Sequence, residues 1–159
     1  MSDNARRQLW SKAKAHAPLP WLRNLALLHE QCTRCGDCIN ACPEHIVIKG
    51  DGGFPCLDFG QGQCSFCARC VASCTIIDLF DRDKKAFAHI VLISDDCLPK
   101  QGIACQSCAD VCEINAITFH WNVHRMREPQ IDRDRCTACG ACYRVCAPHA
   151  IRFQHERST

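Results

Sequence analysis

Sixteen of the seventeen cysteines fall into four tight groups along the chain. Three groups repeat the spacing C-x2-C-x2-C-x3-C, as in CTRCGDCINAC at residues 32–42. The third group, CLPKQGIACQSCADVC, keeps the C-x2-C-x3-C end but has seven residues between its first two cysteines. Thiolates are soft ligands, and this spacing is typical of chains that bind iron–sulfur clusters. The four groups are Cys32, Cys35, Cys38 and Cys42; Cys64, Cys67, Cys70 and Cys74; Cys97, Cys105, Cys108 and Cys112; and Cys136, Cys139, Cys142 and Cys146.

The spacing predicts that the ligand sets cross between groups. A tight loop can turn three thiolates that are two residues apart toward one point, whereas the fourth lies one helical turn further on and points elsewhere. In two-cluster ferredoxins this fourth thiolate binds the other cluster. The first, second and fourth groups therefore predict three [4Fe–4S] clusters, and the split third group predicts a fourth. The expected sets are Cys32, Cys35, Cys38 with Cys74; Cys64, Cys67, Cys70 with Cys42; Cys97, Cys105, Cys108 with Cys146; and Cys136, Cys139, Cys142 with Cys112.

Three other uses of dense cysteines stay open from the residues alone. Zinc sites prefer two CxxC pairs separated by a longer stretch, a metallothionein-like chain would lack strands and aromatic residues, and disulfides belong to oxidising compartments. The repeated pattern of three cysteines followed by a fourth favours iron–sulfur clusters over these alternatives. Cys56 lies outside the groups, and we expect it to be a small buried apolar residue and not a ligand.

The segments between the cysteine groups predict hairpins and short helices. Residues 45–59, HIVIKGDGGFPCLDF, alternate apolar positions around a Gly-rich turn, and residues 116–131 predict a second hairpin. An apolar run at 86–93 has the length of a strand. Short helices fit residues 36–42, 68–74, 106–112 and 140–146. The expected fold class is α+β, with tandem modules resembling the bacterial two-cluster ferredoxins.

Chain length and composition fit two small modules that depend on metal. The chain has 159 residues, of which only 35 are Leu, Ile, Val or Phe, so each half can bury a modest aliphatic core. The charged run DRDKK predicts an exposed connection between the halves. We expect an N-terminal extension at 1–29, a first module at 30–82 and a second at 83–159.

The N-terminal extension is both basic and apolar. Residues 1–29 contain five Lys or Arg and one Asp, which gives a charge of +4. Trp21, Leu22, Leu25 and Leu28 recur at helical spacing and predict one apolar helix face. This face either covers the first module or docks a partner, because Trp and Arg are favoured at interfaces.

Several classes of function do not fit the sequence. Arg6-Arg7 resembles a twin-arginine signal, but no apolar run of signal length follows it, so we expect a cytoplasmic protein. The longest apolar run in this extension, Leu25–Leu28, is too short to span a membrane. No basic stripe with interleaved aromatic residues predicts nucleic-acid binding. No paired carboxylates, nucleophile elbow, phosphate loop or dinucleotide fingerprint predicts an enzyme.

The order of motifs resembles the NapF family, the ferredoxin-type accessory proteins of periplasmic nitrate reductase systems. The resemblance covers residues 32–151 and rests on CTRCGDCINAC, the GDGGFPCLDF hairpin and the split third group. It implies a cytoplasmic iron–sulfur protein that binds the catalytic molybdenum subunit before export. It also implies a role in that subunit's maturation, by supplying electrons or by helping to assemble its cluster. The alternative is an electron-transfer polyferredoxin or the electron-transfer subunit of a redox enzyme complex.

We predict about sixteen iron atoms per chain after anaerobic reconstitution, because four groups imply four [4Fe–4S] clusters. Replacing both Cys105 and Cys108 with Ser should lower the iron content to about twelve, since one cluster loses two ligands. Iron analysis and acid-labile sulfide assays measure both values. A wild-type content already near twelve and unchanged in the variant would show that the third group holds no cluster; stoichiometric zinc would contradict the whole interpretation.

Overall fold

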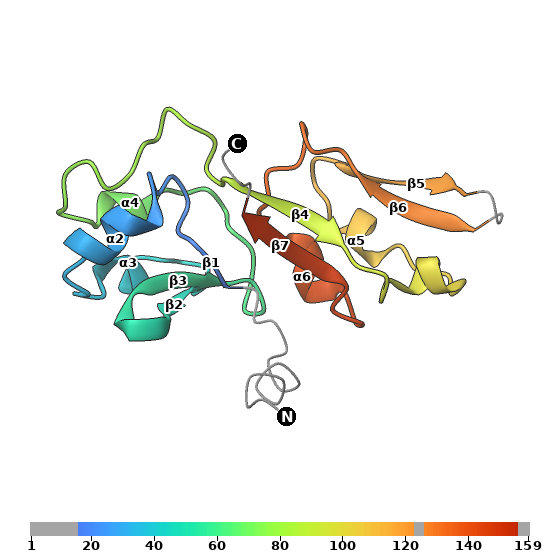
Figure 1. The fold of residues 1–159 in the computed structure, drawn as a ribbon, viewed down its shortest axis with the longest axis horizontal. Coiled ribbons are helices and arrows are strands. Elements are labelled where there is room, and N and C mark those ends of the chain that lie inside the picture. Colours follow the sequence, from blue (N-terminus) through green and yellow to red (C-terminus); the bar gives the residue numbers. More distant parts are fainter. Residues whose placement is uncertain (1–15, 123–125, 156–159) are drawn as a thin grey trace, which may run out of the picture.

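The computed structural model describes residues 16–122 and 126–155, which form two halves that lie side by side (Figure 1). The first half contains a three-stranded antiparallel sheet of order β1-β3-β2 and three short helices. Its elements are β1 (His16–Ala17), α2 (Leu25–Gln31), α3 (Asp37–Asn40), β2 (Val47–Lys49), the 3₁₀ turn η1 (Asp51–Gly53), β3 (Pro55–Asp58) and α4 (Arg69–Ala72).

The second half contains two antiparallel strand pairs, β4–β7 and β5–β6. The β4–β7 pair lies near the middle of the molecule, and the β5–β6 hairpin lies away from the first half (Figure 1). The elements are β4 (His89–Ile93), η2 (Leu98–Gln101), α5 (Ser107–Asp110), β5 (Ile117–Trp121), β6 (Arg127–Ile131), α6 (Ala141–Val145) and β7 (Ile151–His155).

Both halves repeat the same order of a one-turn helix, a hairpin and another one-turn helix. The order is α3-β2-β3-α4 in the first half and α5-β5-β6-α6 in the second. In the second half, β4 precedes this unit and pairs with β7, which follows it. In the first half, a single antiparallel bridge between Leu22 and Phe80 takes that place. Both expected hairpins and the four expected cysteine-bearing helices are present, and the mixture of helices and strands agrees with the expected α+β class.

The segment before the first cysteine group packs against the first half. Ala17 pairs with Leu57, and Leu28 is only 2% exposed. The expected apolar helix face was wrong, because α2 begins only at Leu25. Asn24 caps this helix by accepting the N–H of Leu27 at 2.8 Å, and the preceding Trp21 and Leu22 are not helical. The expected division at residue 29 stays a prediction, and residues 1–15 lie outside the described residues.

Aromatic side chains join the two halves in one continuous core. Phe59, from the end of the first hairpin, is fully buried, and its ring centroid lies 4.7 Å from that of Phe153. Phe66, which follows Cys64, contacts Phe87 with a centroid distance of 5.9 Å. Edge and tilted contacts of this kind add stability beyond the area that they bury. The halves are therefore held together by apolar packing and not only by the chain that connects them.

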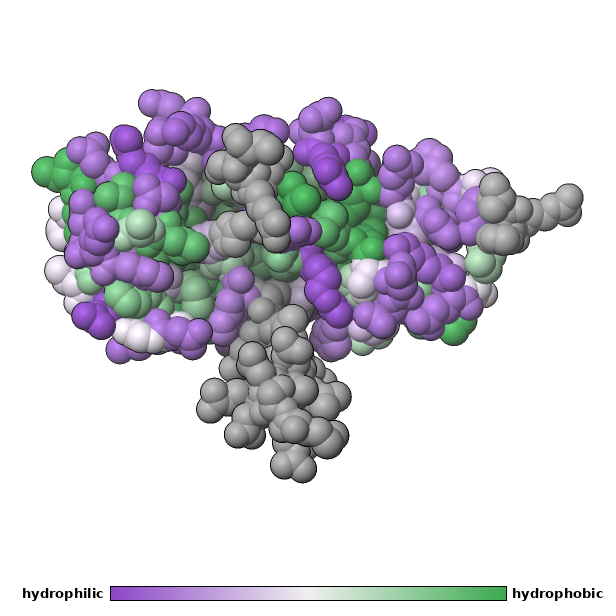
Figure 2. Space-filling model, in the orientation of Figure 1, coloured by the Kyte–Doolittle hydropathy of each residue, from purple (hydrophilic) through white to green (hydrophobic). Residues whose placement is uncertain are grey.

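The central strand pair buries one set of alternate residues more deeply than the other. His89 and Val91 of β4 are buried, whereas Ile90 and Leu92 between them are half-buried. Figure 2 shows apolar surface over β4 and β7 on the viewed face, with hydrophilic residues along the edges. The exposed residues 82–85 connect the halves, as the charged run predicts.

We predict that Gly140→Ala destabilises the reconstituted protein far more than Gly36→Ala. Both glycines follow the second cysteine of a group and have positive φ, 91° and 88°. A Cβ at Gly140 would lie 2.1 Å from Phe59 Cδ1, whereas nothing lies within 4 Å of a Cβ at Gly36. We expect a loss of about 2–4 kcal/mol at Gly140 and about 1–2 kcal/mol at Gly36, where only backbone strain acts.

Denaturant unfolding under anaerobic conditions measures both losses in the free energy of unfolding. Equal losses in the two variants would show that the contact between Phe59 and Gly140 does not hold the halves together. Restoring stability to Gly140→Ala by adding Phe59→Leu would support the contact directly, because the smaller side chain removes the clash.

Candidate metal centres

Four cavities are each lined by one of the crossed sets of four cysteines. We name each cavity after the cysteine group that contributes three residues to it. The first cavity is lined by Cys32, Cys35, Cys38 and Cys74; the second by Cys42, Cys64, Cys67 and Cys70; the third by Cys97, Cys105, Cys108 and Cys146; and the fourth by Cys112, Cys136, Cys139 and Cys142. The structure thus brings together all sixteen grouped cysteines in the expected sets. Ligation of clusters by these residues stays a prediction.

The one-turn helices produce the crossing. Cys38 lies in α3 and lines the first cavity, whereas Cys42, four residues later, lines the second. Residues four apart along a helix would share a face. Here α3 ends at Asn40, so the chain can turn Cys42 toward the other cavity. The same pattern repeats at α4, α5 and α6, where the third and fourth cysteines of the group line different cavities.

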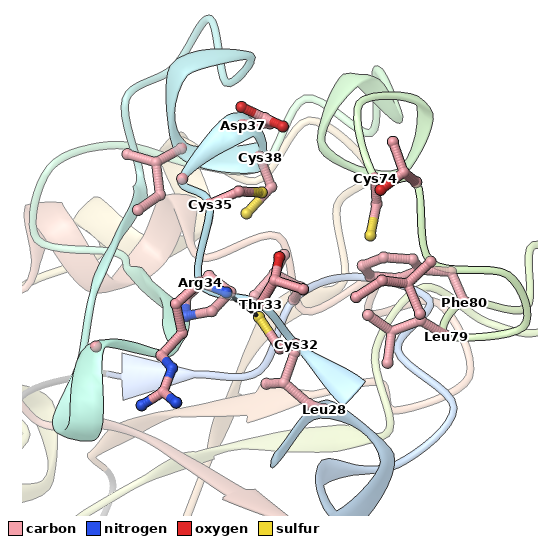
Figure 3. A pocket seen from close by; sticks show the side chains of 17 residues that line it. Leu28, Cys32, Thr33, Arg34, Cys35, Asp37, Cys38, Cys74, Leu79 and Phe80 are labelled. Carbon is pink, nitrogen blue, oxygen red and sulfur yellow. Dashed lines mark hydrogen bonds between the residues drawn. The ribbon is translucent and has the colours of Figure 1, made fainter. Parts of the chain in front are cut away.

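Figure 3 shows the first cavity with its sulfur atoms around a shared space. Cys35 and Cys38 approach from the start of α3, Cys74 approaches from the chain after α4, and Cys32 lies on the remaining side. The guanidinium of Arg34 points away from these sulfur atoms (Figure 3). It donates to the carbonyl of Gly52 at 3.1 Å and lies 4.9 Å from the centre of the Phe54 ring. Arg34 therefore joins the cysteine loop to the first hairpin.

Left-handed backbone conformations recur at matching positions of the cysteine loops. Arg34, Phe66 and Ala138, each two residues after the first cysteine of a group, have φ values of 60°, 56° and 56°. A non-glycine residue in this region is strained, and such strain collects at functional sites. The strain tightens each loop so that successive cysteines face one cavity.

A second repeated position lies three residues after the fourth cysteine. His45, Asn115 and His149 have φ values of 53°, 50° and 52°. The turn at Asn115 lets the next N–H, of Ala116, donate to Cys112 Sγ at 3.3 Å. The turn at His149 lets Ala150 donate to Cys146 Sγ at 3.2 Å in the same way. Hydrogen bonds from backbone N–H groups to cysteine sulfur are among the contacts that tune iron–sulfur sites.

Burial and neighbouring thiolates raise the pKa of the most buried cysteines in the second and fourth cavities. Burial raises the pKa of Cys142 to about 12, and the charges of Cys139, Cys136, Cys108 and Cys112 add to the effect. Burial likewise raises the pKa of Cys70 to about 12, with added repulsion from Cys64, Cys42 and Cys67. A group of irons between the sulfur atoms would supply the missing positive charge. The donor sets therefore fit a cationic cluster held by four thiolates.

The split third group forms a cavity like the others. Cys97 is buried and lines the third cavity, although η2 separates it from the rest of its group. Burial raises the pKa of Cys108 to about 11, and the neighbouring thiolates of Cys97 and Cys146 add to this. Lys100 Nζ donates to the carbonyl of Ile93 at 3.0 Å, which ties the insertion to β4. The insertion therefore leaves a set of four thiols in place and supports a fourth cluster site.

The described residues contain neither a site for a single metal ion nor a disulfide. Within the described residues, no three or more His, Cys, Asp or Glu side chains converge closely enough to hold one metal ion. A closed zinc site would place its sulfur atoms about 2.3 Å from a single ion. All seventeen cysteines lie in the described part of the chain, and all are free thiols.

Cys56 lies apart from the four cavities described here. It belongs to β3, pairs with Ile48 across the hairpin and is half-buried. Its Sγ would lie 2.6 Å from a Cβ at Gly50, so it packs closely under the turn. Burial raises its pKa, and the charges of Asp51 and Asp58 add to this effect. The expectation of a buried side chain is therefore met only in part, and the expectation that Cys56 is not a ligand stays a prediction.

Most of the apolar residues that line the first cavity were missing from the sequence prediction, which named only Leu28 among them. Leu19 and Leu28 come from the segment before the first cysteine, and Leu79 and Phe80 come from the chain after α4. The internal repeat contained a signal for them. In the second half, the apolar strand β4 precedes the cysteines. By analogy, an apolar segment was to be expected before Cys32, the first cysteine of the first half.

Comparison with known proteins agrees with this geometry. A family model for a 4Fe-4S dicluster domain matches residues 103–156. The ferredoxin-type protein NapF of Escherichia coli (strain K12) is 35% identical over 146 residues, which cover 92% of this chain and 89% of that protein. NapF of Haemophilus influenzae is 39% identical over 132 residues, which cover 83% of this chain and 75% of that protein. The chain belongs to the NapF family.

The relatives extend to other ferredoxin-type proteins. The methylamine utilization ferredoxin-type protein MauM of Methylorubrum extorquens is 31% identical over 134 residues, which cover 72% of this chain and 60% of that protein. No solved structure matches the chain. Membership of the NapF family indicates an iron–sulfur protein with an electron-transfer role. Among the described residues, no helix combines the length and apolar character that crossing a membrane requires.

We predict that iron content separates crossed from uncrossed ligand sets. Replacing Cys32 and Cys35 with Ala should remove the first cluster and leave about twelve irons per chain. Adding Cys74→Ala to this variant should remove no further iron, because Cys74 lines the same cavity. Adding Cys42→Ala instead should lower the content to about eight, because Cys42 serves the second cavity.

The two triple variants are matched controls for each other. Each replaces the fourth cysteine of one group in addition to Cys32 and Cys35. Iron analysis after identical anaerobic reconstitution gives the comparison. Loss of further iron with Cys74→Ala and not with Cys42→Ala would show that each group binds its own cluster without crossing.

Proposed function

We propose that the chain is a cytoplasmic iron–sulfur accessory protein that binds the catalytic molybdenum subunit of a periplasmic nitrate reductase before export. In this role it assists maturation of that subunit by supplying electrons or by helping to assemble its cluster. The observation that carries the proposal is the set of four cysteine-lined cavities in a chain of the NapF family. A family whose members are named for this system supports the choice of partner.

The chemistry available at the cavities is electron transfer. A [4Fe–4S] cluster, when bound, takes up and releases one electron, and its potential depends on exposure and on hydrogen bonds to sulfur. The chain's own residues determine both factors. Leu19, Leu28 and Leu79 keep water from one side of the first cavity, whereas Cys35 on the other side is exposed. The first cavity is thus shielded by the core and open toward a partner.

The alternative is an electron-carrying polyferredoxin or the electron-transfer subunit of a redox enzyme complex. Freely diffusing carriers commonly present a strongly charged face that steers docking. This chain has a formal net charge of only +2, because residues 1–29 carry a charge of +4 and the remainder carries a charge of −2. That distribution favours a lasting complex with one large partner over transient encounters with several.

We predict that the reconstituted chain retains the unexported catalytic subunit in an anaerobic pull-down from cytoplasmic extract. Replacing Cys32 and Cys35 with Ser should weaken retention, because the first cavity loses two of its four thiols and the exposed side of the site becomes disordered. A chain that lacks residues 1–15 tests the basic segment separately. This deletion leaves α2 and β1 intact, whereas a deletion of residues 1–29 would also remove Leu19 and Leu28 from the first cavity.

The control is Cys56→Ser, which changes a cysteine outside the four cavities and should retain the subunit as the wild type does. Fractionation of the cells that provide the extract shows whether the protein lies in the cytoplasm or in the periplasm. Recovery of the chain in the periplasm, or no complex with fully reconstituted protein, would contradict the accessory role and leave the electron-carrier alternative.

A further inference from the structure

The two halves meet at a contact between two cysteine loops. The backbone N–H of Cys64 donates to the carbonyl of Cys139 at 2.8 Å. Cys64 belongs to the set around the second cavity and Cys139 to the set around the fourth. Cys64 and its neighbour Ser65 line both cavities. The second and fourth cavities are therefore adjacent, although the third cysteine group lies between their groups in the sequence.

Aromatic packing holds this contact in register on both sides. Phe66, two residues after Cys64, lines the fourth cavity and packs against Phe87 of the second half. Gly140, directly after Cys139, lies against the Phe59 ring so closely that no larger residue fits. Each loop is thus fixed to the opposite half by a residue next to the contact.

Within each half, the cysteine helices bring the two cavities together. Cys38, in α3, lines the first cavity, and Cys42, just after α3, lines the second. Cys108, in α5, lines the third cavity, and Cys112, just after α5, lines the fourth. Only three residues lie between the two cysteines of each pair, so the cavities within a half are neighbours.

The remaining two cavities lie within single halves. All residues that line the first cavity fall between Leu19 and Phe80, in the first half. All residues that line the third cavity fall between Ile93 and Ile151, in the second half. The fourth cavity, in contrast, combines residues 63–66 with residues of the second half. The contact between halves thus involves the second and fourth cavities.

We propose that the four sites form one line in the order first, second, fourth, third, and that the loops of Cys64 and Cys139 hold the second and fourth sites as the closest pair between the halves, where an electron would cross if both clusters were bound. The proposal rests on the proposed iron–sulfur function. The order in space differs from the order in sequence, because the split third group lies at the far end of the line. The first and third sites are the two ends, so two partners can bind at opposite ends of the molecule.

The rival arrangement is a line that follows the sequence, in which the second and third sites are neighbours. Magnetic interaction between reduced clusters separates the two arrangements, because dipolar coupling falls with the cube of distance. Three variants each retain two of the four sites. In every variant, two cysteines in each of the other two groups are replaced by Ala. Cys32, Cys35, Cys105 and Cys108 are replaced to retain the second and fourth sites; Cys32, Cys35, Cys136 and Cys139 to retain the second and third; and Cys64, Cys67, Cys136 and Cys139 to retain the first and third.

Pulsed electron paramagnetic resonance on frozen, reduced samples measures the coupling. We expect the second–fourth variant to show a dipolar frequency several-fold higher than the second–third variant, and the first–third variant to show the weakest coupling. A stronger coupling in the second–third variant than in the second–fourth variant would overturn the proposed order. Iron content is measured on every sample, so an absence of clusters counts against the iron–sulfur function and not against the order.

A second measurement uses the chain with all sixteen cysteines, in case the two-site variants fold poorly. Gly140→Ala should loosen the contact between the halves while iron content is retained. The electron paramagnetic resonance signal of the fully reduced protein, which is broadened by coupling between clusters, should then become narrower. Gly36→Ala is the matched control, because it adds similar backbone strain beside a cysteine but its Cβ meets nothing within 4 Å; the coupled resonance should change less than in Gly140→Ala. An unchanged resonance in Gly140→Ala, with the halves shown to have separated by small-angle scattering, would also overturn the proposal.

Discussion

The structure depends on the cost of placing four thiols around one buried space. Cys70 and Cys142 resist ionisation because burial removes water from them and neighbouring thiolates repel them, which raises the pKa of each to about 12. A cationic group between the four thiols removes both penalties at once. With so few aliphatic residues, the chain has little other means to hold its loops, so metal binding and folding are expected to be coupled. The four cavities are therefore structural centres as well as candidate redox sites.

Backbone strain follows from the same constraint. To face one cavity, three cysteines must lie on a loop that turns sharply after almost every residue. The loops achieve this with residues in the left-handed conformation, such as Arg34, Phe66 and Ala138. Unlike glycine, these residues have a Cβ atom, so the conformation costs free energy at each of them. The surrounding contacts must offset the strain. The bond from Arg34 to Gly52 and the packing of Phe66 against Phe87 are two such contacts.

The junction between the halves combines stability with connectivity. Phe59 and Phe153 supply apolar packing, and the same region places the loop of Cys64 against that of Cys139. A flexible linker between two separate modules would leave the distance between their sites undefined. The shared aromatic core fixes that distance, which is what an electron path through both halves requires.

The sequence by itself determined the chemistry and the local elements. Cysteine spacing predicted the crossed sets that the four cavities contain, and the Gly-rich turn at residues 50–53 predicted the first hairpin, because both depend on neighbours close in the chain. It misjudged Trp21 and Leu22, since helical spacing gave no sign that Leu22 pairs with Phe80. Only the tertiary structure placed Phe59 against Gly140 and Cys64 beside Cys139. These contacts join residues that are far apart in the chain, and they depend on shape complementarity between two folded surfaces, which no local spacing encodes.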